Sequence, residues 1–121
     1  MSAPFCAPRT LQNCVRRAQV GARYVNAPKG FESCSLTFAS GARIELMTTS
    51  RLSPMRHAPG VERMGRTHLA ISLGSEAAVD ELTARLRAEG IVVLDGPCRT
   101  GDGYYESVVL DPEGNRIEIT A

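Results

Sequence analysis

The stretch YESVVLDPEGNRIEI occupies residues 105–119, and a weaker copy of it, FESCSLTFASGARIEL, occupies residues 31–46. The alignment begins by pairing Phe31 with Tyr105 and Glu32 with Glu106, and it needs a gap of one residue in the turn. Each copy has two short runs of β-branched and apolar residues around a glycine-containing turn, which is the pattern of a β-hairpin. The sequence therefore predicts an internal duplication built on two equivalent hairpins.

The second hairpin follows a strand, a helix and another strand. Residues 67–73 alternate between apolar and polar side chains, as a half-buried strand does. Residues 75–89 have apolar residues at helical spacing, with a serine that can cap the first turn and Gly90 to end the last. Residues 91–94, IVVL, are typical of a strand. The second half is thus predicted to be strand, helix, strand and hairpin.

The first half fits the same pattern less well. Residues 9–20 carry an apolar stripe at helical spacing, formed by Leu11, Cys14, Val15 and Ala18, and so predict a helix. When the alignment is carried further upstream, the opening strand falls at about the first residue or before it. We therefore expect the opening strand of the first unit to be either absent or strongly divergent.

The length and composition place the chain among single globular domains. It has 121 residues, of which 43% are hydrophobic and 22% are charged, and these values suit one compact domain. We expect a single domain over residues 1–121, with a first unit at 1–48, a linker at 49–64 and a second unit at 65–121.

The net charge and the lengths of the apolar runs argue against nucleic-acid and membrane partners. Fourteen basic and thirteen acidic residues leave a net charge of +1, which does not favour a nucleic-acid partner. No apolar run approaches the roughly 20 residues that a membrane-spanning helix needs, and residues 1–10 lack the pattern of a signal peptide. We expect a cytoplasmic protein without nucleic-acid or membrane partners, whose four cysteines are reduced and mostly buried.

The polar face of the predicted strands carries side chains that could bind a metal. Alternation separates Glu45, Glu118 and His68 from the apolar residues of their strands. Taken singly, each glutamate is best explained as a solvated residue, because an arginine two positions earlier could form a surface ion pair worth about 0–1 kcal/mol. Because the glutamate recurs in both copies, the set also fits a divalent cation, and Zn, Mn, Fe, Co and Ni are all compatible with such ligands.

At this point the sequence resembles a known superfamily. The motifs HLAIS, DELTARLRAEG and GDGYYESVVLDPEGNRIEI, within residues 66–121, are similar to the second module of the vicinal oxygen chelate superfamily, in its glyoxalase/bleomycin-resistance/dioxygenase group. Residues 24–49 resemble the later part of the first module. The resemblance implies an α+β fold in which paired βαβββ modules form a curved mixed sheet, with helices on the convex face and a metal and substrate in the concavity.

The resemblance also implies a set of metal ligands. Members take one ligand from the first and one from the last strand of each module, and His68, Glu118 and Glu45 match three of these positions. The fourth, a His or Gln on the opening strand of the first module, has no counterpart in residues 1–22, so this module is expected to be incomplete at its N-terminus. Three outcomes remain open: water replaces the missing ligand, His57 supplies it from the linker, or no metal is bound.

The missing strand has a consequence for assembly. It leaves a sheet edge exposed, and such an edge is a template for pairing with another chain. We therefore expect a homodimer, and since members of the superfamily often build each site from two chains, one form of it exchanges modules. Glu45 of one chain would then meet His68 and Glu118 of the other.

The activity implied by the resemblance is that of lactoylglutathione lyase and its relatives. In such a lyase or isomerase, a metal holds two neighbouring oxygens of a small substrate and stabilises the enediolate formed on proton loss, while Glu45 or Glu118 acts as the base. Ring cleavage of catechols is less favoured, because only His57 could supply the extra histidine it uses. The alternatives are a small-molecule binding protein of the bleomycin-resistance type, with Tyr104 or Tyr105 stacking on the ligand, and a truncated inactive relative.

Overall fold

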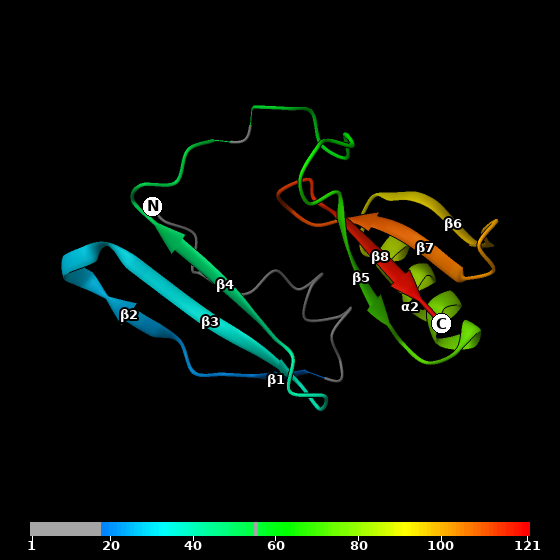
Figure 1. Ribbon diagram of the computed structural model, residues 1–121, viewed down its shortest axis with the longest axis horizontal. Coiled ribbons are helices and arrows are strands. Elements are labelled where there is room, and N and C mark those ends of the chain that lie inside the picture. The colour runs from blue at the N-terminus through cyan, green and yellow to red at the C-terminus, as the bar shows by residue number, and fades with distance from the viewer. Residues whose placement is uncertain (1–17, 55) are drawn as a thin grey trace. The chain divides into compact units, whose positions relative to one another are not determined.

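The computed structural model of the chain describes residues 18–54 and 56–121. It divides into two compact units between Arg56 and His57, and each unit has a sheet of its own (Figure 1). This boundary falls inside the segment 49–64 that the sequence marks as a linker. The helix and the mixed sheet of the second unit give the fold its α+β class.

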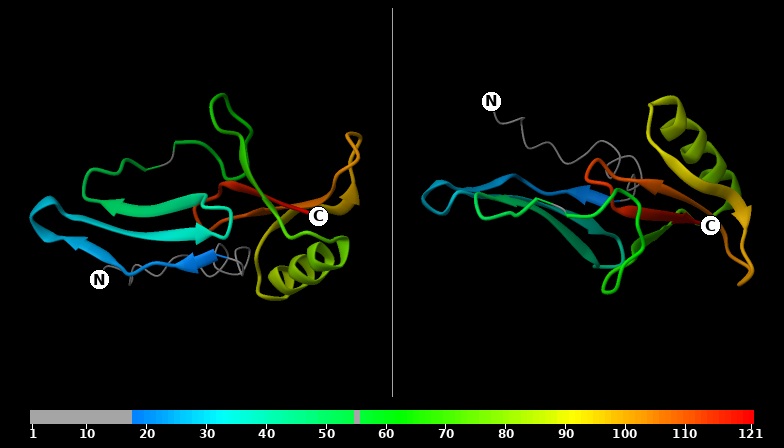
Figure 2. Two further views of the ribbon diagram at one scale, coloured as in Figure 1. Left: turned by 60° about the horizontal axis from the view of Figure 1, so that its bottom comes forward. Right: turned by 90° about the horizontal axis from the view of Figure 1, so that it is seen from above.

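The second unit has the predicted order of strand, helix and three strands. Its sheet runs in the order β5-β8-β7-β6, in which β5 and β8 are parallel and the other neighbours are antiparallel. The helix lies along one face of this sheet (Figure 2). The elements are β5 (His68–Ser72), α2 (Glu76–Ala88), β6 (Val93–Arg99), β7 (Tyr105–Leu110) and β8 (Arg116–Thr120).

Helix α2 begins and ends where the sequence predicts. The Ser75 hydroxyl accepts a hydrogen bond from the Ala78 amide at 3.2 Å and caps the first turn. Gly90 follows the last turn with a φ of 83°, a conformation that favours glycine. The apolar face of the helix packs on the sheet, and the buried apolar residues of the unit are Ile71, Val79, Leu82, Leu86, Val108, Val109, Ile117 and Ile119.

Strand β6 differs from the prediction at both ends. The sequence predicts a strand over residues 91–94, whereas β6 starts at Val93 and continues to Arg99. It runs through Gly96 and Pro97, a pair that is typical of a turn, and its pairing with β7 shifts register there. Proline has no backbone N–H to donate. The sheet tolerates Pro97 because β6 is an edge strand, and no neighbouring strand needs a hydrogen bond from its outer side.

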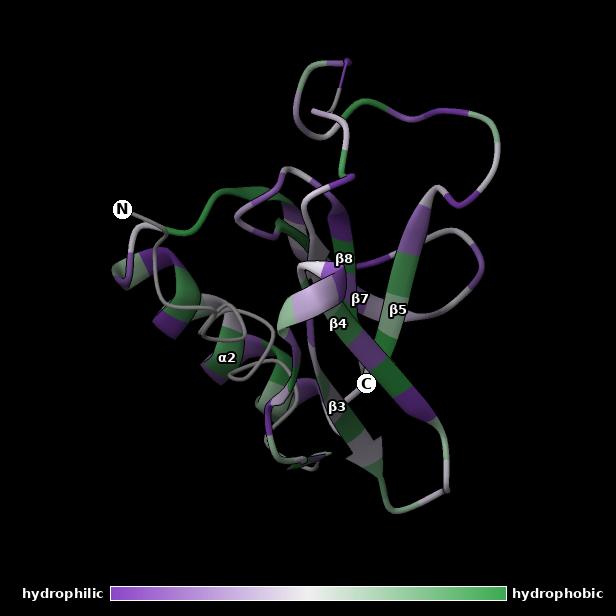
Figure 3. Ribbon diagram, turned by 90° about the vertical axis from the view of Figure 1, so that its left-hand side faces the viewer, coloured by the Kyte–Doolittle hydropathy of each residue, from purple (hydrophilic) through white to green (hydrophobic). Residues whose placement is uncertain are grey.

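The first unit is an antiparallel sheet centred on β3 (Phe31–Phe38). Strand β4 (Arg43–Thr49) pairs along one edge of β3, and β1 (Ala18–Val20) and β2 (Tyr24–Asn26) both pair along the other. A short 3-10 helix, η1 (Ala27–Lys29), joins β2 to β3. Hydrophilic and hydrophobic residues alternate along β4 (Figure 3), as expected for a strand with two different faces.

The predicted helix over residues 9–20 is wrong at its C-terminal end, because residues 18–20 form β1. Val20 pairs with Leu36, whose side chain is fully buried in β3. Pairing with an existing strand outweighs the helical spacing of a few apolar residues in a short segment. Residues 9–17 lie outside the described residues.

The two hairpins correspond without the predicted gap. In each turn the amide of the first residue donates to the carbonyl of the fifth, Phe38 to Ala42 and Asp111 to Asn115, both at 2.9 Å. The two turns therefore have the same length. The strands that lead into the two turns are therefore aligned by counting back from the turns. This alignment differs by one residue from the alignment based on identical residues.

The corrected alignment changes the counterpart of Glu106. Counted back from the turn, Glu106 corresponds to Ser33 and not to Glu32. Glu32 faces the same side of its sheet as Cys34 and Leu36, whereas Ser33 faces the other side. A slip of one residue moves every side chain of a strand to the opposite face, so the two glutamates are not equivalent.

Candidate functional site

The candidate site lies on the face of the second unit's sheet that points away from helix α2. Ile117 and Ile119 of β8 are buried on the helix side, so alternation turns Glu118 to the other side. The parallel register places Ala70 of β5 opposite Glu118, and His68 shares the face of Ala70. Strands β5 and β8 thus display His68 and Glu118 on the same face of the sheet.

His68 and Glu118 are in contact on this face. The distance from His68 Nε2 to Glu118 Oε2 is 3.2 Å. The small side chain of Ala70 lies directly opposite Glu118 and leaves the diagonal path to His68 open. The Glu118 side chain is 17% exposed and that of His68 is 44% exposed. The structure therefore brings together two of the three predicted site residues at a partly shielded, accessible position.

Glu106 adds a second carboxyl group to the site. It pairs in register with Thr120 of β8, and alternation places it on the same face of the sheet as Glu118. Burial, together with the neighbouring side chain of Glu118 and its negative charge, raises the pKa of Glu106 above its ordinary value of 4.5, against an opposing effect of His68. Sequence analysis missed Glu106 because the repeat alignment paired it with Glu32. Alternation counted back from the turn would have placed it on the site face.

Arg116 does not serve as the ion-pair partner of Glu118 that the sequence suggests. Its Nη1 donates to the Gly60 carbonyl oxygen at 3.2 Å, and its Nη2 lies 3.7 Å from a Glu62 carboxylate oxygen. The Gly60 amide in turn donates to the Gly114 carbonyl oxygen at 2.9 Å. Through these contacts Arg116 connects the end of the linker to the start of β8. Glu118 contacts His68 and not Arg116.

Glu45, the third predicted site residue, belongs to the first unit. It lies in the middle of β4, opposite Ser35 of β3, and its side chain is exposed. Ile44 and Leu46 occupy the opposite face of the strand, as alternation predicts. Its role as a metal ligand and base stays a prediction.

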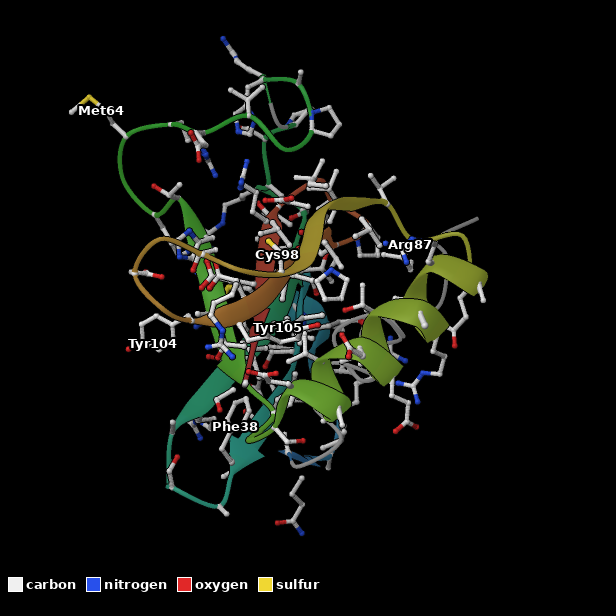
Figure 4. The ribbon with its side chains drawn as sticks, turned by 90° about the vertical axis from the view of Figure 1, so that its right-hand side faces the viewer. Phe38, Met64, Arg87, Cys98, Tyr104 and Tyr105 are labelled. Carbon is white, nitrogen blue, oxygen red and sulfur yellow. The ribbon has the colours of Figure 1, made fainter. Side chains whose placement is uncertain are left out.

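The remaining candidate residues are His57 and two tyrosines, Tyr104 and Tyr105. His57 Nδ1 lies 3.2 Å from the Ala58 carbonyl oxygen, and its Nε2 is buried without a hydrogen-bond partner among the described residues. Tyr105 donates to an Asp80 carboxylate oxygen at 2.6 Å, whereas Tyr104 is 59% exposed and points outward (Figure 4). One tyrosine thus packs against the helix and the other is free to contact a ligand.

The cysteines divide between core and surface. Cys34 is buried, as predicted for a small hydrophobic residue. Cys98 is exposed on β6, so the prediction of burial is wrong there, because an edge strand leaves this position open to solvent. Cys6 and Cys14 lie outside the described residues.

The comparison with known proteins assigns the family. Residues 18–119 match the glyoxalase/bleomycin resistance protein/dioxygenase superfamily. The chain belongs to this superfamily. The βαβββ order of its second unit, with β5 parallel to β8, is the module that the sequence resemblance implied.

Individual relatives cover the chain to different extents. The uncharacterized protein YqjT of Bacillus subtilis (strain 168) is 37% identical over 62 residues, which are 49% of this chain and 48% of that protein. The match therefore spans about half the length of this curated relative.

Two solved structures illustrate the shared fold. A glyoxalase family protein from Bacillus cereus matches with a TM-score of 0.74 and 13% identity, over 99% of this chain and 87% of that one. A mutant of glyoxalase I from Zea mays matches with a TM-score of 0.69 and 16% identity, over 93% of this chain and 38% of that one. At these identities the likeness concerns the fold alone.

The donor atoms of the site suit a divalent metal in their chemistry. An imidazole nitrogen and a carboxylate oxygen lie side by side in His68 and Glu118, and this combination binds Zn and its neighbours in proteins. Within residues 18–54 and 56–121, no three side chains of His, Cys, Asp or Glu are gathered in the manner of a metal site. A complete ligand set therefore needs a further donor beyond this pair.

None of the helices in the part of the chain that the structure describes has both the length and the apolar character needed to cross a membrane. The cytoplasmic location stays a prediction.

Proposed function

We propose that this chain is a metal-dependent lyase or isomerase of the glyoxalase type that acts on a small oxygenated substrate. The observation that carries this proposal is the 3.2 Å contact between His68 Nε2 and Glu118 Oε2 on the open face of the second unit. These residues occupy the first and last strands of the module, where the superfamily resemblance implies metal ligands. Membership of the superfamily supports the same assignment.

The metal would be held by His68, Glu118 and Glu45, and its identity would be Zn, Ni, Co, Mn or Fe. When bound, such a cation would hold two neighbouring substrate oxygens and stabilise the negative charge of an enediolate. The first two residues are already adjacent. Glu45 is exposed on its own unit and is accessible to a metal.

The chain's own carboxylates would move the proton. A general base has to reach the substrate C–H group and still be shielded enough to remain basic. Glu118 meets both conditions, because its side chain is 17% exposed and it lies on the open face of the sheet. Glu118 or Glu45 would take the proton from one substrate carbon and return it to the neighbouring position.

We also propose that the chain forms a homodimer with exchanged modules. Among the described residues β4 pairs only with β3, whereas β8, its counterpart in the second unit, pairs with both β7 and β5. The outer edge of β4 therefore offers backbone donors and acceptors to a further strand. In this dimer Glu45 of one chain would meet His68 and Glu118 of the other.

Metal content tests the assignment. The full chain is incubated with each candidate ion, dialysed and analysed by mass spectrometry for bound metal, and about one ion per chain is expected for the preferred metal. Glu118→Gln should lose the ion, and Glu113→Gln, at an exposed acid in a turn, should keep it. A wild-type chain that stays metal-free would refute the proposal and favour a bleomycin-resistance-type binding protein or an inactive relative.

Proton abstraction is tested separately from binding. The metal-loaded chain is mixed with α-hydroxycarbonyl compounds and with hemithioacetals in heavy water, and deuterium incorporation is followed by NMR. The proposed base requires exchange that Glu118→Gln abolishes. Metal binding without exchange on any substrate of this class would argue against a lyase or isomerase.

Mixing two variants tests the shared site. Glu45→Gln and Glu118→Gln chains are unfolded together, refolded and assayed for metal. In a dimer with exchanged modules, a mixed pair regains one intact site, because one chain contributes Glu45 and the other contributes Glu118. If each chain builds its own site, mixing restores nothing, and module exchange is refuted.

A further inference from the structure

Arg116 brings a permanent positive charge to the face of the sheet that carries the candidate site. Alternation along β8 turns Arg116 to the same side as Glu118, and the parallel register aligns it with His68 of β5. The other arginine in the four strands of this sheet is Arg99, which lies on the helix side and forms an ion pair with Glu76 of α2. Among the described strand residues of the second unit, Arg116 is therefore the one lysine or arginine on the site face.

The fold uses only part of the hydrogen-bonding capacity of this guanidinium group. Nη1 of Arg116 donates to the Gly60 carbonyl oxygen at 3.2 Å, whereas Nη2 lies 3.7 Å from a Glu62 carboxylate oxygen, which is longer than a hydrogen bond. The Glu62 side chain is 70% exposed, and an exposed ion pair of this length contributes little to stability. The Arg116 side chain is itself 23% exposed, so an anion from solvent can take the place of Glu62.

The spacing along the sheet suits one small molecule that reaches both Arg116 and the proposed metal-binding pair. Neighbouring strands lie about 5 Å apart, and residues two apart on one strand are about 7 Å apart. Arg116 is separated from His68 by the first spacing and from Glu118 by the second. A ligand whose two neighbouring oxygens lie at His68 and Glu118 therefore reaches the position of Arg116 with a short tail.

The charges on this face favour an anionic tail at Arg116 and disfavour it elsewhere. Glu106 and Glu118 lie on the same face, and their carboxylates repel an anion placed over the middle of the sheet. Arg116 stands at the start of β8, away from Glu106, which is aligned with Thr120 at the other end of the strand. A guanidinium group presents its donors as a planar fork, which fits the oxygens of a carboxylate or a phosphate.

We propose that Arg116 determines substrate specificity by binding an oxyanion, a carboxylate or a phosphate, at the end of the substrate remote from the reacting carbons. The substrate class is then a small α-hydroxycarbonyl compound with an anionic tail. The tail displaces Glu62 from Nη2, while Nη1 keeps its hydrogen bond to Gly60. This inference rests on the proposed function for the reacting end of the substrate, whereas the contact with the anion needs no metal.

The experiment compares 5-hydroxy-4-oxopentanoate with its uncharged amide, which has the same α-hydroxycarbonyl group and the same length. Binding of each compound to the full chain is measured by calorimetry, with and without the metal that the chain retains. The wild-type chain should bind the acid about tenfold more tightly than the amide, as expected for a charge-assisted hydrogen bond. Arg116→Gln should abolish this preference by weakening the binding of the acid alone. Arg87→Gln, the same change at an exposed position of helix α2, should retain the preference.

Dihydroxyacetone phosphate, compared with dihydroxyacetone, provides the phosphate arm of the same experiment. A preference that is larger for the phosphate than for the carboxylate identifies the tail as a phosphate, and the reverse identifies it as a carboxylate. Absence of a preference in both arms overturns the inference.

A second variant tests the displacement of Glu62 without altering Arg116. Glu62→Gln removes the competing carboxylate, so the acid should bind about two- to fivefold more tightly while the amide binds as before. If Arg116 only holds the linker, this tightening is absent, and Arg116→Gln changes the binding of acid and amide equally. Because Glu62 is exposed, this variant also decides the question if Arg116→Gln fails to fold.

Failure of this inference is distinguishable from failure of the proposed function. A chain that binds metal and exchanges the substrate proton, but treats acid and amide alike, retains the proposed function and refutes the anion contact. A chain that binds no metal refutes the proposed function. Its preference for the acid, and the loss of that preference in Arg116→Gln, still decide the role of Arg116.

Discussion

A buried pair of hydroxyl groups joins helix α2 to strand β7, directly behind the candidate site. The Oγ atoms of Thr83 and Ser107 are 2.6 Å apart, and the two residues are 0% and 1% exposed. Thr83 also donates its proton to the Val79 carbonyl oxygen at 2.7 Å. Because Thr83 has only one proton to donate, Ser107 must be the donor to Thr83.

This assignment of donors predicts unequal costs for the two single substitutions. Thr83→Val keeps the volume but leaves the buried Ser107 hydroxyl without an acceptor, which should lower the free energy of unfolding by about 1–3 kcal/mol. Ser107→Ala removes the donor while Thr83 still donates to Val79, so the loss should be smaller, about 0.5–1.5 kcal/mol. In the double variant no orphaned hydroxyl remains, and its cost should fall below the sum of the two single costs by about 1 kcal/mol.

Urea unfolding followed by far-ultraviolet circular dichroism measures these free energies, and it suits a chain without tryptophan. Thr37→Val, at an exposed strand position, is the control and should change the stability by less than about 0.5 kcal/mol. The reasoning is refuted if the two single costs add fully in the double variant. It also fails if Ser107→Ala costs more than Thr83→Val, since the donor assignment would then be reversed.

Two further predictions concern the same unit. The hydrogen bond to Asp80 raises the pKa of Tyr105 above 10.0. The contribution of this hydrogen bond to stability is therefore full below pH 10.0 and is lost as the pH rises through the folded-state pKa. Urea unfolding on both sides of pH 10.0 should show this loss in Tyr104→Phe, which keeps the hydrogen bond, but not in Tyr105→Phe. A Cβ at Gly96 would lie 2.5 Å from a backbone oxygen of β7, at a φ of +75°, so Gly96→Ala should lower the free energy of unfolding by more than about 1–2 kcal/mol. Gly101→Ala, which meets nothing within 4 Å, should leave the same measurement unchanged.

The elements of the second unit were predictable because several local signals agree in each of them. Helix α2 has an apolar stripe, a capping serine before it and a glycine after it, and the structure uses all three. Strand β5, which precedes the helix, alternates between exposed and more buried positions. Strand β6 was harder to predict, because a glycine–proline pair indicates a turn unless the strand lies at an edge, and sheet order is not a local property.

The start of the first unit shows the opposite case. Residues 18–20 complete an apolar stripe with helical spacing, yet they form β1. The deciding contact is the pairing of this segment with residues 36–38 of β3. No sequence window of helical length contains both partners, so a rule based on local spacing cannot weigh the pairing against the stripe.

The sequence predicts the face of the sheet for those site residues whose orientation follows from alternation within their own strand. Alternation puts Glu118 and His68 on the polar faces of their strands, and in the structure His68 Nε2 lies 3.2 Å from Glu118 Oε2. Glu106 was missed because matching letters aligned it with Glu32, whereas the equal turns align it with Ser33. Hydrogen bonds fix register from the turn, so a one-residue error there reverses the face of a whole strand. The asymmetry that results is chemical as well as geometric, because the second hairpin carries two carboxyl groups on one face, Glu106 and Glu118, where the first hairpin carries Ser33 and Glu45.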